Sequence, residues 1–207
     1  SLLIDPQKLP VRELYQHLIG IICPRPIAWV SSVSPRGIPN LAPFSFFNGV
    51  AANPPTLVFS PVNKRDGSKK DTVRNIEANR EFVVNVVSFA LAERMNQSSA
   101  EYDYEISEFA ECGLTPVPSE RVRPPRVQEA PVQLECVLHQ IVPVGEGPLA
   151  ANLVIGRILL IHVDAGVLDG AGQIDPGKLD AVGRMGGMSY TRTRDRFELP
   201  RPQVGRS

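Results

Sequence analysis

The chain has 207 residues, with 22 Lys and Arg against 22 Asp and Glu, so its formal net charge at pH 7 is zero. This balance argues against a nucleic-acid-binding protein, which carries a basic excess or a basic stripe. The 20 prolines argue against a helical bundle, because proline interrupts helix interiors, and they favour a turn-rich domain that contains β-strands.

Cysteine and histidine spacing gives no indication of a metal site. The three cysteines form no C-x-x-C pair, and the three histidines do not occur at the spacing of two ligands on one helix or strand. We therefore expect no metal and a reducing, cytoplasmic location. The two most apolar stretches, 18–33 and 153–163, are interrupted by proline or charged residues. They fall short of the roughly 20 apolar residues that a membrane helix needs, so no membrane span is expected.

The first half of the chain predicts strands separated by turns, with one helix. The segment 27–33 is apolar and rich in β-favouring residues, and the sequence SPRG at 34–37 then supplies turn chemistry for a hairpin. A continuous β-branched run at 82–87 is typical of a central strand. The predicted elements are strands over 27–33, 40–48, 56–60 and 82–87, with a helix from about 71 to 79.

The second half predicts two short helices followed by a long antiparallel pair. Gly113 is placed to cap the second helix, and a proline-rich segment then crosses the surface. The predicted elements are helices over 90–100 and 107–112, a crossing over 115–131, strands over 132–144 and 153–163, a tight turn at 169–170, and an arginine-bearing tail. This order predicts one mainly β (α+β) domain over 1–207, a β-barrel with short helical excursions, in which 184–207 forms a C-terminal arm.

Residues 40–48 (NLAPFSFFN) combine three aromatic side chains with small polar ones in one predicted strand. Regular alternation places Ser45 and Phe47 on one face and Phe44, Phe46 and Asn48 on the other. Such a strand would supply a flat surface and edge donors for a planar heteroaromatic ligand. An ordinary strand with a phenylalanine-rich core face is the alternative, and the segment alone leaves both interpretations open.

The loop at 62–70 brings four basic residues to the start of the predicted helix. Ser68 and Asp71 have the spacing of a capping box, which places the helix start here. A helix N-terminus offers free N–H groups and partial positive charge, and nearby Lys and Thr donors would complete a phosphate site. An ordinary capped surface helix with solvated lysines fits the same segment.

Several segments in consistent order between residues 5 and 202 resemble the flavin reductase-like, FMN-binding split-barrel family. They are RPIAWVSS (25–32), NLAPFSFFN (40–48), NPP (53–55), KDT (70–72), RNI (74–76), EFVVN (81–85), APV (130–132), LEC (134–136), LVIG (153–156) and FELPRP (197–202). The Lys-Asp-Thr sequence at 70–72 is similar to the flavoredoxin-type branch. The resemblance implies a homodimeric Greek-key split barrel that binds FMN near the dimer interface.

The resemblance also assigns residues to the parts of the cofactor. Matched position by position, it places Ser45, Phe46, Phe47 and Asn48 at the isoalloxazine ring, Ser60, Pro61 and Val62 at the ribityl chain, and Lys70, Asp71 and Thr72 at the phosphate, with Arg25 as an additional contact.

The implied activity is that of an NAD(P)H:flavin (FMN) oxidoreductase that passes electrons through the flavin to a second acceptor, such as an oxygenase partner. The alternative is a flavoredoxin-like FMN electron carrier, or a flavin-binding protein with little NAD(P)H activity of its own. Flavin carries the redox chemistry in either case, so no catalytic side chain is expected. No G-x-G-x-x-G follows a predicted strand, so a nicotinamide nucleotide would share the flavin cleft.

The tail offers two interpretations. The two glycines of 184–190 would allow close approach to a ligand, and Tyr190 would cover a ring, so this segment would line the cleft. Alternatively, it connects flexibly to an arm that wraps a partner subunit. The six arginines from Arg184 onward would attract a nucleotide phosphate, or they form an ordinary solvated surface.

Overall fold

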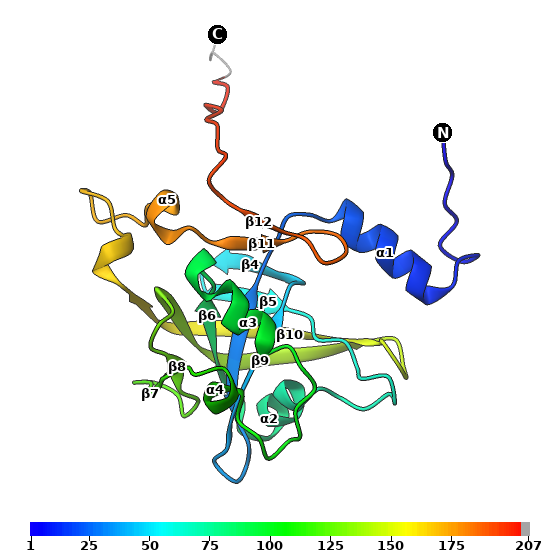
Figure 1. The fold of residues 1–207 in the computed structure, drawn as a ribbon, viewed down its shortest axis with the longest axis horizontal. Coiled ribbons are helices and arrows are strands. Elements are labelled where there is room, and N and C mark those ends of the chain that lie inside the picture. Colours follow the sequence, from blue (N-terminus) through cyan, green and yellow to red (C-terminus); the bar gives the residue numbers. More distant parts are fainter. Residues whose placement is uncertain (204–207) are drawn as a thin grey trace.

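The computed structural model describes residues 1–203 and is built around one seven-stranded antiparallel sheet, in the order β3-β2-β6-β9-β10-β5-β4 (Figure 1). The strands are β2 Ala28–Val33, β3 Pro39–Phe44, β4 Phe47–Ala52, β5 Pro55–Phe59, β6 Glu81–Val86, β9 Val132–Val144 and β10 Ala151–Val163. Its two edge strands, β3 and β4, are joined by Ser45 and Phe46 alone, so the sheet curls to bring its edges together. This incompletely closed barrel confirms the predicted split-barrel fold.

The longest pairing in the sheet joins β9 to β10, as the sequence predicts for 132–144 and 153–163. Two register shifts interrupt this pair, one of them between Ile155 and Gly156. The bulge lets β10 bend over the barrel interior, and Gly156 faces the ring of Phe82 there. A long pair with bulges is therefore the element that curves the sheet.

Strand β2 shows why two separate cores form. Its side chains alternate, so Ala28 and Val30 face the barrel interior with Phe59 and Phe82, while Trp29 faces the opposite side. Both faces are buried, because helices cover the second one, and Trp29 Nε1 donates to Ser98 Oγ there at 2.9 Å. This double burial explains why three consecutive residues of the strand, Ala28, Trp29 and Val30, are apolar.

Short helices cover the outside of the barrel, largely where the sequence predicts them. Helix α2 (Asp71–Asn79) matches the predicted 71–79. The predicted helix 90–100 is a 3-10 turn, η1 (Phe89–Leu91), followed by α3 (Ala92–Gln97), and the second is α4 (Glu108–Glu111) with Gly113 at a φ of 61° beyond its end. The remaining short elements are β7 (Pro116–Val117), β8 (Arg126–Val127), η2 (Ala165–Val167) and α5 (Pro176–Leu179).

The predicted single strand over 40–48 is wrong. The chain bends at Ser45 and Phe46, and β4 leaves to pair with β5 on the other edge of the sheet. Alternation therefore restarts after the bend, so Phe44 and Phe47 both pack against the barrel core and do not lie on opposite faces.

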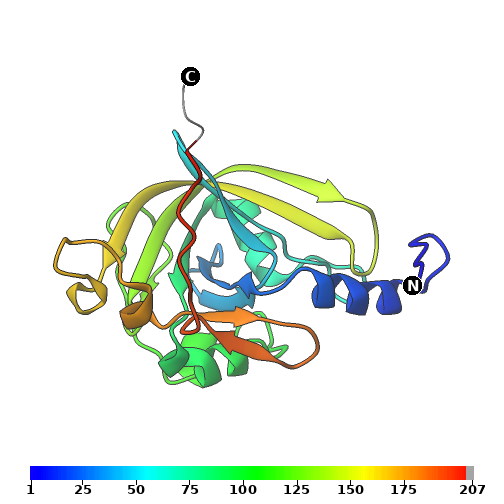
Figure 2. The same ribbon diagram turned by 90° about the horizontal axis from the view of Figure 1, so that it is seen from above.

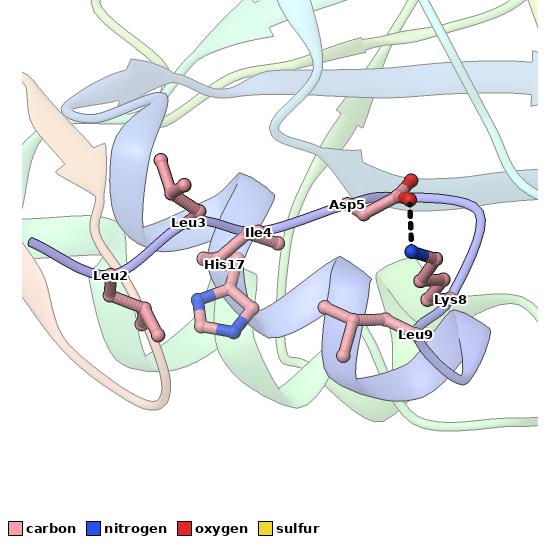
Figure 3. Close-up of a pocket in the computed structure, with 7 residues that line it drawn as sticks. All are labelled: Leu2, Leu3, Ile4, Asp5, Lys8, Leu9 and His17. Carbon is pink, nitrogen blue, oxygen red and sulfur yellow. Dashed lines mark ion pairs between the residues drawn. The ribbon is translucent and has the colours of Figure 1, made fainter.

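An N-terminal helix, α1 (Val11–Ile21), lies beside the barrel and was not predicted (Figures 1 and 2). Ile19 is its only buried residue. Figure 3 shows the segment before it folding along the helix, where Leu2, Leu3, Leu9 and His17 help to line a cavity of about 500 Å³. Helix α1 thus leaves a large apolar surface uncovered within this chain.

The C-terminal part adds a small antiparallel sheet, in which β11 (Val182–Arg184) pairs with β1 (Arg25–Pro26) and β12 (Tyr190–Arg192). The predicted arm 184–207 therefore begins inside this sheet, and its residues 193–203 extend away from the barrel in Figure 1. Its last residues, 204–207, lie outside the described part of the chain. Among residues 1–203, no helix has the length and apolar character needed to cross a bilayer.

Candidate functional site

A cavity of about 290 Å³ lies between strand β3, the start of α2 and the segment that follows α3. Its lining residues are Asn40, Ala42, Pro43 and Phe44 on β3, Lys64 in the loop before α2, Lys70, Asp71 and Thr72 at the start of α2, residues 98–103, and Glu108 on α4. The cavity therefore contains the three residues predicted at a phosphate, together with groups from four separate parts of the chain.

The start of α2 leaves backbone donors free. Lys70 is the N-cap and provides no side-chain cap, and the first N–H groups of an α-helix, here those of Asp71 and Thr72, have no partner within the helix. The predicted capping box is wrong, because Ser68 bonds to Asp66 instead, with its hydroxyl 2.6 Å and its N–H 2.8 Å from Oδ1. Ser68 therefore forms a local turn with Asp66 and does not cap α2, so the helix N-terminus remains open toward the cavity.

The basic side chains of the cavity are held by ion pairs. Lys64 Nζ lies 3.1 Å from Asp71 Oδ2, and Arg74 Nη1 lies 3.0 Å from Asp71 Oδ1. Lys70 Nζ lies 3.7 Å from Glu101, whose side chain is mostly exposed. These pairs place two ammonium groups beside the free N–H groups of α2. Such a donor set fits a phosphate, since both kinds of donor bind anions at helix N-termini.

A hydrogen-bonded chain connects Thr72 to a buried carboxylate. The hydroxyl of Thr72, which is 1% exposed, donates to Asn40 Oδ1 at 2.9 Å, and Asn40 Nδ2 donates to Glu108 Oε1 at 2.7 Å. The backbone N–H of Leu41 donates to Glu108 Oε2 at 2.8 Å. Burial of the carboxyl group raises the pKa of Glu108 to about 7 despite these bonds. The Thr72 hydroxyl is thus already engaged as a hydrogen-bond donor to Asn40.

The residues predicted at the isoalloxazine ring lie at the bend between β3 and β4. The Phe46 ring meets Tyr15 of α1 edge-on at 6.5 Å between centroids, and the Arg25 guanidinium lies 5.7 Å from the Phe46 centroid. The exposed Asn48 accepts a bond from the N–H of Gly49 through its own Oδ1. At this bend the Phe46 ring therefore faces α1, whereas the rings of Phe44 and Phe47 pack against the barrel core.

The residues predicted at the ribityl chain connect this bend to the cavity. Ser60 N donates to the carbonyl of Phe46 at 2.9 Å, Asn152 N donates to the carbonyl of Pro61 at 2.8 Å, and Val62 forms a bridge with Ala151. The chain then reaches Lys64, which contacts the start of α2. The structure thus gathers Lys70, Asp71 and Thr72 in the cavity, while Ser45–Asn48 and 60–62 lie on the connected strand ends beside it.

Arg25 is a buried organising residue at this end of the barrel. It is 4% exposed, and its Nη1 donates to the carbonyl of Ile19 at 2.7 Å and to that of Ile22. Its Nη2 donates to the carbonyl of Met185 at 3.0 Å, and Nε reaches Ser45 Oγ at 3.4 Å. A cation at a helix C-terminus is stabilised by the terminal carbonyls. Arg25 therefore ties α1, the small sheet and the bend together, and its direct contact with a ligand stays a prediction.

Asn40, Lys64 and Glu108 are among the polar lining residues that the sequence did not assign to the site. Asn40 begins the aromatic segment 40–48, and Lys64 belongs to the basic loop 62–70. Both therefore lie in segments that the sequence links to a ligand. Glu108 had no comparable signal, because only the packing of α4 against β3 brings it to the cavity.

The chain matches the flavin reductase like domain over residues 21–182. It is 42% identical to an uncharacterized protein of Aquifex aeolicus, over 86% of this chain and 89% of that protein. Nitrilotriacetate monooxygenase component B from Bacillus cereus has a TM-score of 0.91 and 37% identity, with 96% of this chain and 98% of that chain covered. Pseudomonas fluorescens 2-nitrobenzoate 2-nitroreductase has a TM-score of 0.86 and 31% identity, with 100% and 99% covered. The likeness to both structures extends over nearly the whole chain.

Proposed function

This chain belongs to the flavin reductase-like family and is a flavin-related oxidoreductase, and on that premise we propose that it binds FMN, accepts hydride from NAD(P)H and passes the electrons to a second acceptor. The observation that carries the proposal is the donor set at the start of α2. Free N–H groups of Asp71 and Thr72 and the ammonium groups of Lys64 and Lys70 share one cavity, which is the chemistry that a flavin phosphate requires.

The cavity residues have the task of binding and orienting the cofactor. The start of α2 would hold the phosphate, residues 60–62 would follow the ribityl chain, and the bend at Ser45–Asn48 would border the ring. The bound flavin supplies the hydride and electron transfer. The side chains at the bend would orient the ring, and one face of the ring would have to stay accessible to a nicotinamide.

The proposed acceptor is a separate protein or small molecule rather than a group on this chain. A solved relative is the component B of a monooxygenase, and another is a nitroreductase. The first favours a reductase that supplies an oxygenase partner. On this proposal, the chain acts at the step where nicotinamide electrons enter such a system.

Homodimer formation is part of the proposal, and α1 is the proposed contact surface. The helix exposes Val11 (65%) and Ile21 (73%), and the preceding segment exposes Leu2 (79%) and Leu3 (93%). Apolar side chains exposed together in this way are typical of a protein interface. We expect light scattering after size exclusion to give twice the chain mass of 22.6 kDa, and a monomer would contradict this assignment.

Anaerobic reduction tests the activity directly. The purified protein, loaded with FMN, is mixed with NADH or NADPH without oxygen, and the flavin absorbance is followed. The proposal predicts rapid bleaching with at least one nicotinamide. Persistent colour with both would leave a flavoredoxin-like carrier, and failure to bind FMN would overturn both functions.

A further inference from the structure

We propose that Glu108 sets the affinity of the cavity at the start of α2 for the flavin phosphate, because the phosphate binds against the negative charge of this carboxylate until Glu108 takes up a proton. The inference rests on the proposed function and deepens it. Glu108 acts here as a specificity-determining residue. It changes the affinity for a flavin that carries a phosphate group and leaves the affinity for a flavin without one unchanged.

The position of Glu108 is fixed at the cavity wall. The residue is 6% exposed, and its two carboxylate oxygens accept bonds from Asn40 Nδ2 at 2.7 Å and from the N–H of Leu41 at 2.8 Å. The Leu41 donor belongs to the backbone of β3, so the carboxylate cannot turn away without losing a buried bond. The carboxylate is therefore a fixed part of the cavity wall.

The other carboxylates of the cavity are neutralised or solvated. Asp71 is paired with both Lys64 and Arg74, and Glu101 is paired with Lys70 and has a side chain that is 75% exposed. Asp103 is exposed to solvent. Among residues 1–203, Glu108 has no ion pair. Its buried charge is thus the one that opposes an anion most strongly.

The groups around Glu108 also determine when it is charged. Burial raises its pKa to about 7, and the nearby charge of Asp71 acts in the same direction. The titratable and charged groups that face it or lie near it are Lys70 and Asp71 from α2, Lys64 from the preceding loop, Glu101, Tyr102 and Asp103 from the segment after α3, and Glu111 and Cys112 next to it on and after α4. A phosphate added to this set favours the protonated form further, since like charges disfavour ionisation.

The hydrogen-bonded chain to Thr72 also weakens phosphate binding while Glu108 is charged. With a carboxylate at position 108, Asn40 donates through Nδ2 to that carboxylate and accepts the hydrogen bond of the Thr72 hydroxyl on Oδ1. A glutamine at this position carries one donor and one acceptor, so Asn40 would turn its amide and release the Thr72 hydroxyl. The substitution Glu108→Gln therefore removes a repelling charge and frees a donor for the phosphate.

The test compares FMN with riboflavin, which lacks the phosphate, in the full chain and in Glu108→Gln. At pH 8, one unit above a pKa of about 7, we expect the variant to bind FMN about tenfold more tightly than the wild type does. At pH 6 the two proteins should bind FMN equally, and riboflavin affinity should be the same at both pH values. Glu111→Gln, an exposed change on the same helix outside the cavity, should behave as the wild type.

Proton uptake tests the same inference without a variant. Calorimetry at pH 8 in two buffers of different ionisation enthalpy should show that the wild type takes up close to one more proton with FMN than with riboflavin. Equal proton uptake, or equal FMN affinity of Glu108→Gln and wild type at pH 8, would overturn the inference while leaving FMN binding intact. A wild-type chain that binds neither flavin would overturn the proposed function as well.

Discussion

A Cβ atom placed on Gly156 would lie 2.3 Å from Cζ of Phe82 in the interior of the barrel. The glycine sits at the bulge where β10 bends, and the phenylalanine ring of β6 fills the space that a side chain would need. This contact explains why the curved sheet requires glycine here although its backbone is not left-handed.

Gly156→Ala should lower the free energy of unfolding by about 2 kcal/mol or more, because the Phe82 ring must move within a packed core. Urea unfolding followed by circular dichroism measures the change. Gly170→Ala is the control, since no atom lies within 4 Å of its added methyl group. Equal stability of Gly156→Ala and the wild type would show that the core yields more easily than the contact indicates.

The barrel could be predicted from the sequence because each strand carries local signals. The long pair 132–144 and 153–163 and the helix 71–79 were recovered in this way. Helix α1 was missed, although Val11, Leu14, Leu18 and Ile22 have helical spacing. Its apolar side chains are largely exposed, so burial within the chain does not account for them.

The bend at Ser45 and Phe46 could not be predicted, because both halves of 40–48 are good strand sequences. The break depends on which strand each half pairs with, β2 or β5, and that is a property of the whole sheet. Glu108 was missed for a related reason, since only tertiary packing brings α4 to the cavity. The family resemblance singled out Lys70, Asp71 and Thr72, and all three line the cavity, while their contact with a phosphate stays a prediction.

Glu135→Gln should destabilise the segment that follows β7 and lower the free energy of unfolding by roughly 2–3 kcal/mol. The carboxylate is fully buried and accepts the N–H groups of Glu120 at 2.9 Å and Arg121 at 2.6 Å, with His162 Nε2 at 2.6 Å. Denaturant unfolding of this variant and of the exposed Glu146→Gln measures the effect, and equal losses in both would contradict it.

The same residue predicts a pH dependence. Although burial acts to raise it, the pKa of Glu135 is lowered in the folded chain by its hydrogen bonds and by His162. Its contribution is therefore present above the unfolded pKa and is lost as pH falls through the folded pKa. The stability difference between wild type and Glu135→Gln should shrink progressively below about pH 4.5.

Glu108 should show the opposite dependence. Its folded pKa of about 7 exceeds the ordinary value of 4.5, so the folded chain holds a proton that the unfolded chain has released. Stability therefore falls as pH rises between these values, by on the order of 3 kcal/mol for this group. Unfolding measured from pH 4.5 to 8 should show this loss in the wild type and not in Glu108→Gln, and parallel profiles would contradict the assignment.

Arg25→Met should lower the free energy of unfolding by on the order of 3 kcal/mol, since it leaves the carbonyls of Ile19, Ile22 and Met185 without their donor. Because Arg25 organises the bend at Phe46, the variant should weaken FMN and riboflavin binding by the same factor. Arg12→Met, an exposed change on α1, is the control. A selective loss of FMN binding would instead place Arg25 at the phosphate.

The central claim, that the cavity at the start of α2 binds the flavin phosphate, is tested most directly by the ratio of the riboflavin and FMN dissociation constants. In the wild type, FMN should bind at least about tenfold more tightly, the equivalent of one charge-assisted hydrogen bond. The double variant Lys64→Ala/Lys70→Ala should bring the ratio close to one. Lys69→Ala, whose ammonium group pairs with Glu77 and lies outside the cavity, should preserve it. Equal affinity for both flavins in the wild type, or an unchanged ratio in the double variant, would contradict the account.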